Sequence, residues 1–131
     1  MTTASVSERY VVDSSGWIEY IGDGPKAEGF AKYLDQPEFV LLPTIVVYEV
    51  YKKLRRESTS RLAQEFLSGA FGFHERIIDL DVSMAEFAAR ISIECKLAMA
   101  DALIYAAART RRATLVTADF HFSGLDSVTL I

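Results

Sequence analysis

The chain has 131 residues, of which half are hydrophobic, and a formal net charge of −4 at pH 7. This length suits one sizeable core, so we expect a single domain over 1–131 with a flexible start at 1–8. The acidic balance argues against a passive electrostatic nucleic-acid binder, but not against an enzyme that acts on nucleic acid.

Membrane insertion and thiol chemistry are not expected. The longest apolar run is far shorter than the roughly 20 residues that span a bilayer, and the polar start has no apolar signal-peptide core. We therefore expect a cytoplasmic protein that makes no membrane contact. The single cysteine, Cys95, has no partner for a disulfide or a CxxC zinc site, so we interpret it as a core or boundary residue.

Short apolar runs alternate with helical patterns in the first half of the chain. Ser14 and Ser15 follow the first run as candidate N-caps. The segment from Ile45 is assigned to a helix despite its β-branched residues, because its pattern extends into the good helix formers KKLRRE. The predicted elements are a strand over 9–13, helices over 16–20 and 26–34, a strand over 38–42, a helix from 45 through KKLRRE, and a helix around 62–67.

The same alternation continues in the second half. Ser83–Glu86 fits the capping-box pattern at the start of a helix. The remaining predicted elements are a strand over 76–80, that helix running to about Cys95, an Ala-rich helix over 100–111, and strands over 113–117 and 127–131. Short apolar strands that alternate with helices indicate a parallel sheet covered on both faces. The expected fold is α/β, a three-layer α/β/α domain with a mostly parallel sheet of four to five strands.

Four acids stand out by their position in this pattern. Asp13 and Asp119 end the first and fourth predicted strands, whereas Glu49 and Asp101 interrupt apolar helices. Each has a structural interpretation, as a turn cap, a first-turn acid favoured by the helix dipole, or the partner of a lysine one helical turn later. Together, four carboxylates at the ligand-binding edge of an α/β sheet would repel one another unless a divalent cation neutralised them. Oxygen ligands of this kind suit Mg²⁺ or Mn²⁺.

The segments around these four acids make the chain resemble a known family, the PIN-domain ribonucleases, and especially the VapC-type toxins of toxin–antitoxin pairs. The resemblance runs from about Tyr10 to the C-terminus. It rests on four stretches whose order and spacing match the acidic motifs of the family: VVDSSGWIEY, TIVVYEV, ADALIYAAA and LVTADFHF. Any one of them is weak evidence, whereas four in order are fairly specific.

The resemblance implies a PIN-like domain that hydrolyses RNA phosphodiester bonds with the assistance of Mg²⁺ or Mn²⁺. Asp13, Asp101 and Asp119 match the acids that bind the metal directly. Glu49 matches an acid that either binds a second ion or holds a metal-bound water. The family's products carry a 5′-phosphate and a 3′-hydroxyl, and we expect the same here.

Smaller features around the acids also match the family or depart from it. Ser15 matches a frequent hydroxyl near the first acid, and Thr117 matches the threonine two residues before the last one. Ala118 and the pair Phe120–His121 stand where the family often has charged residues, so whether a further ligand follows Asp119 stays open. Asp126 is interpreted as a turn residue.

The resemblance implies three partners: an RNA substrate, a small antitoxin that holds the enzyme inactive, and a second copy of the chain. The expected homodimer uses the helices near 29–34 and 61–71. A basic helix face offers an RNA track, since Lys52, Lys53 and Arg56 share a helical face with Glu49. The alternative for this face is an ordinary solvated surface. His74 and His121 are given no role.

Two other function classes fit parts of the pattern. A receiver domain or an aspartyl-phosphate phosphohydrolase also has an acid after its first strand. However, the phosphohydrolase pattern requires a second acid two residues later, where this chain has Ser15, and a receiver requires a lysine after a late strand, where none follows Asp119. A catalytically silent PIN-like binding module is a third possibility, and the presence of all four acids argues against it.

Overall fold

The computed structural model describes residues 8–131, so the predicted flexible start lies outside the described residues, apart from Glu8. Five parallel strands form one sheet in the order β3-β2-β1-β4-β5. Their bounds are β1 Tyr10–Val12, β2 Val40–Pro43, β3 Ile77–Ile78, β4 Thr114–Thr117 and β5 Val128–Leu130. The first strand is therefore central, and the carboxyl ends of all five strands lie along one edge.

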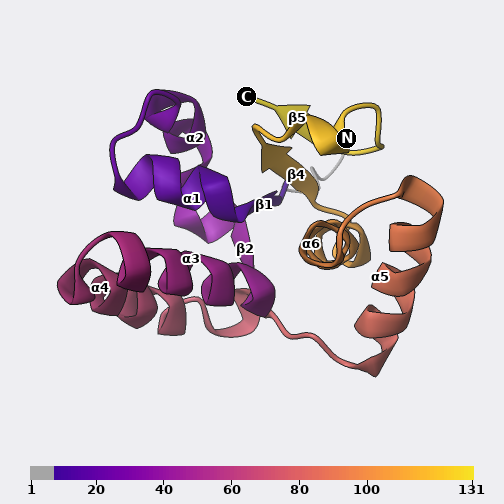
Figure 1. Ribbon diagram of the computed structural model, residues 1–131, viewed down its shortest axis with the longest axis horizontal. Coiled ribbons are helices and arrows are strands. Elements are labelled where there is room, and N and C mark those ends of the chain that lie inside the picture. The colour runs from indigo at the N-terminus through magenta and orange to yellow at the C-terminus, as the bar shows by residue number, and fades with distance from the viewer. Residues whose placement is uncertain (1–7) are drawn as a thin grey trace, which may run out of the picture.

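Helices cover both faces of this sheet. Helices α1 to α4 gather on one side of it, and α5 and α6 lie on the other (Figure 1). The bounds are α1 Ser14–Ile21, α2 Ala27–Leu34, α3 Thr44–Glu57, α4 Ser60–Phe71, α5 Val82–Cys95 and α6 Met99–Thr110. The expected three-layer α/β/α fold is confirmed, and its described strands are all parallel.

Two predicted helix caps are wrong, for the same physical reason. The cap of α1 is Asp13 rather than Ser14 or Ser15, because the Asp13 carboxylate accepts a hydrogen bond from the Gly16 amide. In α5, Asp81 takes the place of the predicted Ser83 box and accepts from the Met84 amide at 2.9 Å. A carboxylate caps as well as a hydroxyl and also interacts favourably with the helix dipole.

All five predicted strands are shorter in the structure than expected, and the runs 38–42 and 76–80 are examples. The start of the 38–42 run is a 3-10 turn over Pro37–Phe39, and only the part from Val40 pairs with β1. Of the 76–80 run, only Ile77–Ile78 is a strand, since β3 is an edge strand with β2 as its one neighbour. Neither difference moves an element that carries one of the four acids.

The core lies on both faces of the central strands. Val11 and Val12 of β1 and Leu115 and Val116 of β4 are fully buried, as a parallel sheet between two helical layers requires. The Ala-rich stretch 104–108 of α6 is also buried, and its helix packs on β1 and β4. Small side chains let this helix approach the sheet closely, which sets the depth of Asp101 in its first turn.

Gly16, in the first turn of α1, is a second point of close approach. A Cβ atom at Gly16 would lie 2.6 Å from Cγ1 of Val12 and 2.6 Å from the ring of Phe30, two side chains that are themselves fully buried. Neither neighbour can move into open space, so this position requires glycine. The Gly16 amide also donates a hydrogen bond to the capping carboxylate of Asp13, which links the tight packing to the sheet edge.

We predict that Gly16→Ala lowers the free energy of unfolding by about 1–3 kcal/mol, because the added methyl overpacks the core. Gly69→Ala is the matched control, since Gly69 also lies in a helix but a Cβ there would meet nothing within 4 Å. That control should be neutral or stabilise by up to about 1 kcal/mol. Urea unfolding of both variants measures the difference. Equal stabilities would contradict the packing at Gly16.

Among residues 8–131, none of the helices combines the length and the apolar character that crossing a bilayer requires. Cys95 ends α5 at an intermediate depth, in agreement with its assignment as a boundary residue. Of the two predicted dimer helices, α2 uses Phe30 and Leu34 inside the chain, where both are buried. In α4, Phe71 is 74% exposed, so its side chain is not used in the core and is available for contact with a second copy.

Candidate metal centre

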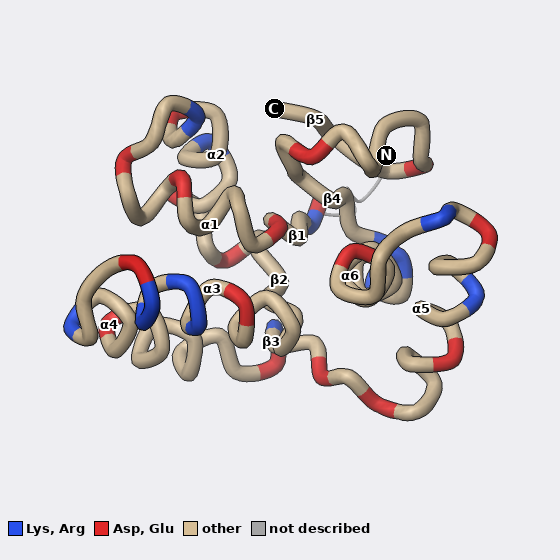
Figure 2. Tube along the Cα trace, viewed as in Figure 1, with Lys and Arg blue, Asp and Glu red and all other residues tan. Residues whose placement is uncertain are grey.

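The four predicted acids lie around the carboxyl ends of the two central strands. Asp13 follows β1 and Asp119 follows β4, while Asp101 lies in the first turn of α6 and Glu49 in the middle of α3. Figure 2 shows acidic segments of α3 and α6 and at the end of β1 around the centre of the molecule. Segments as far apart in the chain as those that carry Asp13 and Asp119 thus meet at one edge.

Asp13 is the innermost of these acids, with only 5% of its surface exposed. Its Oδ1 accepts hydrogen bonds from the Ser15 hydroxyl and the Gly16 amide, each at 3.0 Å. Burial raises the pKa of the Asp13 carboxyl, the hydrogen bonds oppose this rise, and the charge of Asp119 adds to it. An aspartyl nucleophile must be reachable by its phosphodonor, so this burial argues against the receiver and phosphohydrolase alternatives.

Thr117, at the end of β4, connects two of the acids. Its fully buried hydroxyl donates to Oδ2 of Asp13 and accepts a hydrogen bond from the Asp119 amide at 2.9 Å. One hydroxyl therefore orients the Asp13 carboxylate and fixes the backbone from which Asp119 projects. This contact gives a physical reason for a threonine two residues before the last acid.

Asp101 and Asp119 form the open part of the site together with His121, a residue for which no role was predicted. One ligand atom each of Asp101, Asp119 and His121 lie within 4.8 Å of one another. Burial raises the pKa of the Asp101 carboxyl, and the charges of Asp119 and Glu49 raise it further. His121 follows Asp119 by two residues in the 3-10 turn Phe120–Phe122. This short spacing from Asp119 is the one feature of the sequence that could have identified His121 as part of the site.

Glu49 approaches the site from α3. Its Oε1 accepts a hydrogen bond from the Ser14 hydroxyl, so the predicted partnership with a lysine on its own helix is not what holds it. Ser14 is free to make this contact because Asp13, not Ser14, caps α1. The charge of Glu49 raises the pKa of Asp101, which places the two carboxylates in one electrostatic cluster.

The donor set fits a divalent cation. Two carboxylates and an imidazole converge within ligand distance, and two more acids add negative charge around them. Divalent cations are bound by carboxylate oxygen and, for transition metals, by imidazole nitrogen. Burial is the largest cause of the raised pKa of Asp101, and the charges of Asp119 and Glu49 add a repulsion that such an ion would relieve.

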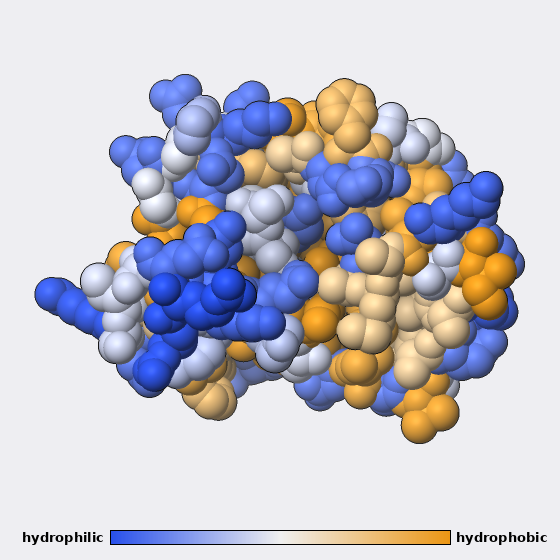
Figure 3. Space-filling view, viewed as in Figure 1, coloured by the Kyte–Doolittle hydropathy of each residue, from blue (hydrophilic) through white to orange (hydrophobic). Residues whose placement is uncertain are grey.

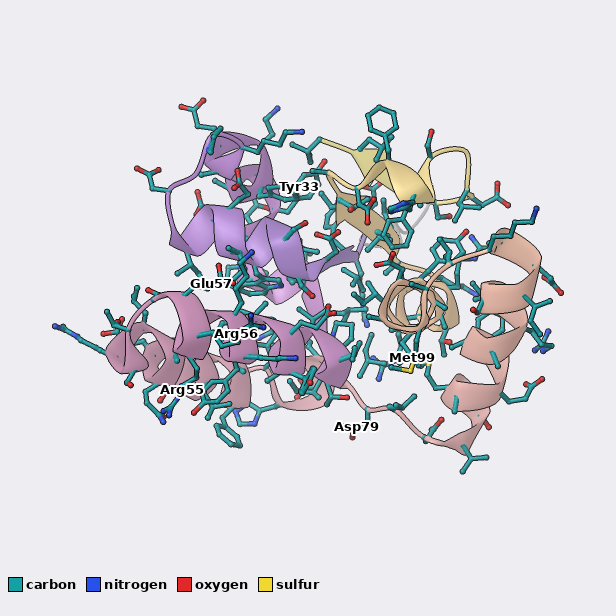
Figure 4. The ribbon with its side chains drawn as sticks, viewed as in Figure 1. Tyr33, Arg55, Arg56, Glu57, Asp79 and Met99 are labelled. Carbon is teal, nitrogen blue, oxygen red and sulfur yellow. The ribbon has the colours of Figure 1, made fainter. Side chains whose placement is uncertain are left out.

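A groove extends from Glu49 along α3. It has a volume of about 400 Å³ and runs between α1 and α3, and its walls include Ser14, Glu49, Lys52, Lys53, Arg56 and Glu57. Lys53 lies 3.9 Å from the Glu57 carboxylate, so Lys52 and Arg56 are the cations without such a pairing among those walls. In Figure 4, Arg56 and Glu57 lie on the side of α3 that faces α1, whereas Arg55 lies on the far side. The predicted basic face thus lines a groove that begins at Glu49 and continues along α3.

Comparison with known proteins gives a family match over most of the chain. The family model described as PIN domain matches residues 10–128. The comparison with curated proteins found none that matches.

Solved structures show the same fold. The chain is similar to a toxin–antitoxin complex from Klebsiella pneumoniae, with a TM-score of 0.75 and 21% identity over 92% of this chain and 95% of that one. It is also similar to FitAcB from Neisseria gonorrhoeae, with a TM-score of 0.71 and 22% identity over 93% and 96%. A third is VapC20 of Mycobacterium tuberculosis, described as a sarcin–ricin loop cleaving toxin, with a TM-score of 0.65 and 18% identity over 88% and 91%.

Proposed function

The chain belongs to the PIN-domain family, and from this membership and its acidic edge we propose that it is a metal-dependent endoribonuclease. Its reaction is hydrolysis of RNA phosphodiester bonds. The observation that carries the proposal is the convergence of Asp101, Asp119 and His121 within 4.8 Å, with Asp13 and Glu49 adjacent. A structural neighbour that cleaves the sarcin–ricin loop supports RNA as the substrate class.

The acids have different proposed roles, which follow from how deeply each side chain is buried. Asp101 and Asp119 would hold the cation. Asp13, which was expected to bind the metal directly, already accepts hydrogen bonds within the chain at both carboxylate oxygens, so we assign it the supply of negative charge beneath the ion. Glu49 would keep its expected role, binding a second ion or a metal-bound water. When bound, Mg²⁺ or Mn²⁺ supplies Lewis acidity that activates water and stabilises charge on the phosphate. Thr117 and Ser14 hold Asp13 and Glu49 in fixed orientations through their hydroxyls, so the charged wall is formed before substrate arrives.

The direct test is cleavage of a labelled RNA by the purified chain. Cleavage should require Mg²⁺ or Mn²⁺, stop on addition of EDTA and resume when excess Mn²⁺ is returned. Cleavage that persists in EDTA would contradict a metal-dependent mechanism. RNA that binds but is never cut would instead support a silent binding module.

The groove along α3 is the proposed path of the RNA strand, because Lys52 and Arg56 can contact successive phosphates beside Glu49. Figure 3 shows hydrophilic residues gathered over α3. Lys53 contributes less, since Glu57 already offsets its charge. RNA affinity should therefore depend on a few cations despite the negative net charge of the whole chain.

We predict that replacing Lys52 and Arg56 together by alanine weakens RNA binding and flattens its salt dependence. Each phosphate contact to single strands contributes a slope of roughly 0.7, so two lost contacts should reduce it by roughly 1.4. Arg55→Ala removes a cation from the far side of the same helix and is the matched control. Fluorescence anisotropy at several salt concentrations gives the slopes. Equal slopes for the two variants would place the RNA elsewhere.

We also propose that the chain is the toxin of a type II toxin–antitoxin pair, acting in the cytoplasm as a homodimer. Two of the structural neighbours are described as a toxin–antitoxin complex and as a toxin. Exposed apolar side chains on α4 to α6, Phe71, Ile93 and Met99, offer surface that protein partners can bury. Light scattering measures the mass of the free chain, and co-expression with a small neighbouring reading frame tests for an antitoxin.

A further inference from the structure

His121 is not placed by packing. Its side chain is 79% exposed, and its Nδ1 lies 2.9 Å from Oδ1 of Asp119. In the described residues 8–131, Asp119 is the one side chain with which it forms a polar contact. Burial therefore does not explain why this imidazole lies over the acidic edge.

The backbone around His121 holds it there. Asp119 caps the 3-10 turn by accepting a hydrogen bond from the His121 amide at 2.9 Å. At the other end of the turn, Phe122 is fully buried and packs against Tyr105 of α6, with ring centroids 6.3 Å apart. The turn is thus fixed to the helix that carries Asp101, so His121 faces that acid from a rigid support.

We propose that His121 is the third protein ligand of the cation held by Asp101 and Asp119, and that its nitrogen shifts the preference of the site from Mg²⁺ toward Mn²⁺. This inference rests on the proposed function, since it concerns the same ion. A neutral imidazole offers one unprotonated nitrogen as a ligand. Mg²⁺ takes oxygen ligands almost exclusively. Imidazole nitrogen is a softer donor that suits transition-metal ions better than Mg²⁺, and Mn²⁺ is the transition-metal ion of the two that we expect here.

The decisive measurement is pulsed electron paramagnetic resonance of Mn²⁺ bound to the full chain without RNA. A directly bound imidazole couples its nitrogen to the Mn²⁺ electron spin. The parent should show this coupling, and His121→Ala should lose it. The chain has only two histidines. His74 therefore provides the matched control, replaced by asparagine because its φ of 51° is one that asparagine tolerates. His74→Asn should keep the coupling.

Affinities give the second readout. His121→Ala should weaken Mn²⁺ binding by at least about 10-fold, since even the loss of an outer partner of a metal ligand costs about 10-fold to 100-fold. Mg²⁺ binding should change little. His121→Asp should restore a third ligand but lower the ratio of Mn²⁺ to Mg²⁺ affinity. Since His121 is exposed, thermal unfolding should show both variants folded.

The outcomes separate the two proposals. Mn²⁺ that binds the parent without nitrogen coupling, or an unchanged affinity ratio in His121→Asp, would overturn the role of His121 and leave the proposed nuclease intact. A parent chain that binds no Mn²⁺ at all would overturn both.

Discussion

Replacing Asp101 by asparagine is expected to slow RNA cleavage in Mn²⁺ on the order of 10²-fold to 10³-fold. The amide keeps the shape of the side chain but removes the charge that would hold the cation against the phosphate. Metal ions supply several kcal/mol of transition-state stabilisation, and each 1.36 kcal/mol changes a rate tenfold. Single-turnover cleavage of labelled RNA measures the loss. Asp79→Asn, at an exposed acid between β3 and α5, makes the same charge change and should cut at the parent rate.

The same substitution should stabilise the metal-free fold. Burial, followed by the charges of Asp119 and Glu49, raises the pKa of the Asp101 carboxyl. The folded chain therefore binds this proton more tightly than the unfolded chain. The ionised group destabilises the fold above its folded pKa, and the effect fades as the pH falls toward the unfolded value of about 3.9.

Asp101→Asn should accordingly melt at a higher temperature than the parent at pH 7 in EDTA, with the gain shrinking toward pH 4. A variant that is more stable and yet inactive cannot have lost its activity by unfolding. A gain that is equal at both pH values would argue against charge repulsion at this edge.

Thr117→Val is the second substitution with a large expected effect. It is nearly isosteric, but it leaves the buried Oδ2 of Asp13 and the Asp119 amide without their shared partner. An unsatisfied buried polar group costs about 1–3 kcal/mol, so we expect the free energy of unfolding to fall by about 2–4 kcal/mol and cleavage to weaken as well. Thr117→Ser keeps the hydroxyl and should recover most of the lost stability and most of the lost cleavage activity.

The pH dependence of this destabilisation tests its cause. The Thr117 hydrogen bond lowers the pKa of the Asp13 carboxyl against the larger effect of burial. Without it that pKa rises further, so the ionised carboxylate destabilises the fold more. Chemical unfolding in EDTA should show a larger difference between Thr117→Val and the parent at pH 7 than near pH 4. A stability difference that is smaller at pH 7 than near pH 4 would mean that lost packing, not the charge of Asp13, dominates the destabilisation.

The fold and the convergence of the acids could be predicted because they depend on local patterns. Strands that end in Asp13 and Asp119, and a helix that begins near Asp101, fix the positions of these acids once the sheet is parallel. Glu49 was recognisable because a carboxylate within an apolar helix is unusual. Their roles as ligands stay predictions, although the structure places them around one edge.

What the sequence did not predict depends on competition between neighbouring groups. Ser14 and Asp13 are both good caps, and only the folded backbone shows that Asp13 caps α1 while Ser14 holds Glu49. His121 lies in a short turn whose direction depends on the burial of Phe122, a contact with a distant helix.

We propose that this acidic edge directs water, with a metal ion, onto an RNA phosphodiester bond. Cleavage in water enriched in ¹⁸O, followed by mass spectrometry of the product ends, tests it most directly. We predict 5′-phosphate ends that carry one ¹⁸O atom and 3′-hydroxyl ends, formed with Mn²⁺ and absent with EDTA. Products that end in 2′,3′-cyclic phosphate, formed equally well in EDTA, would contradict it.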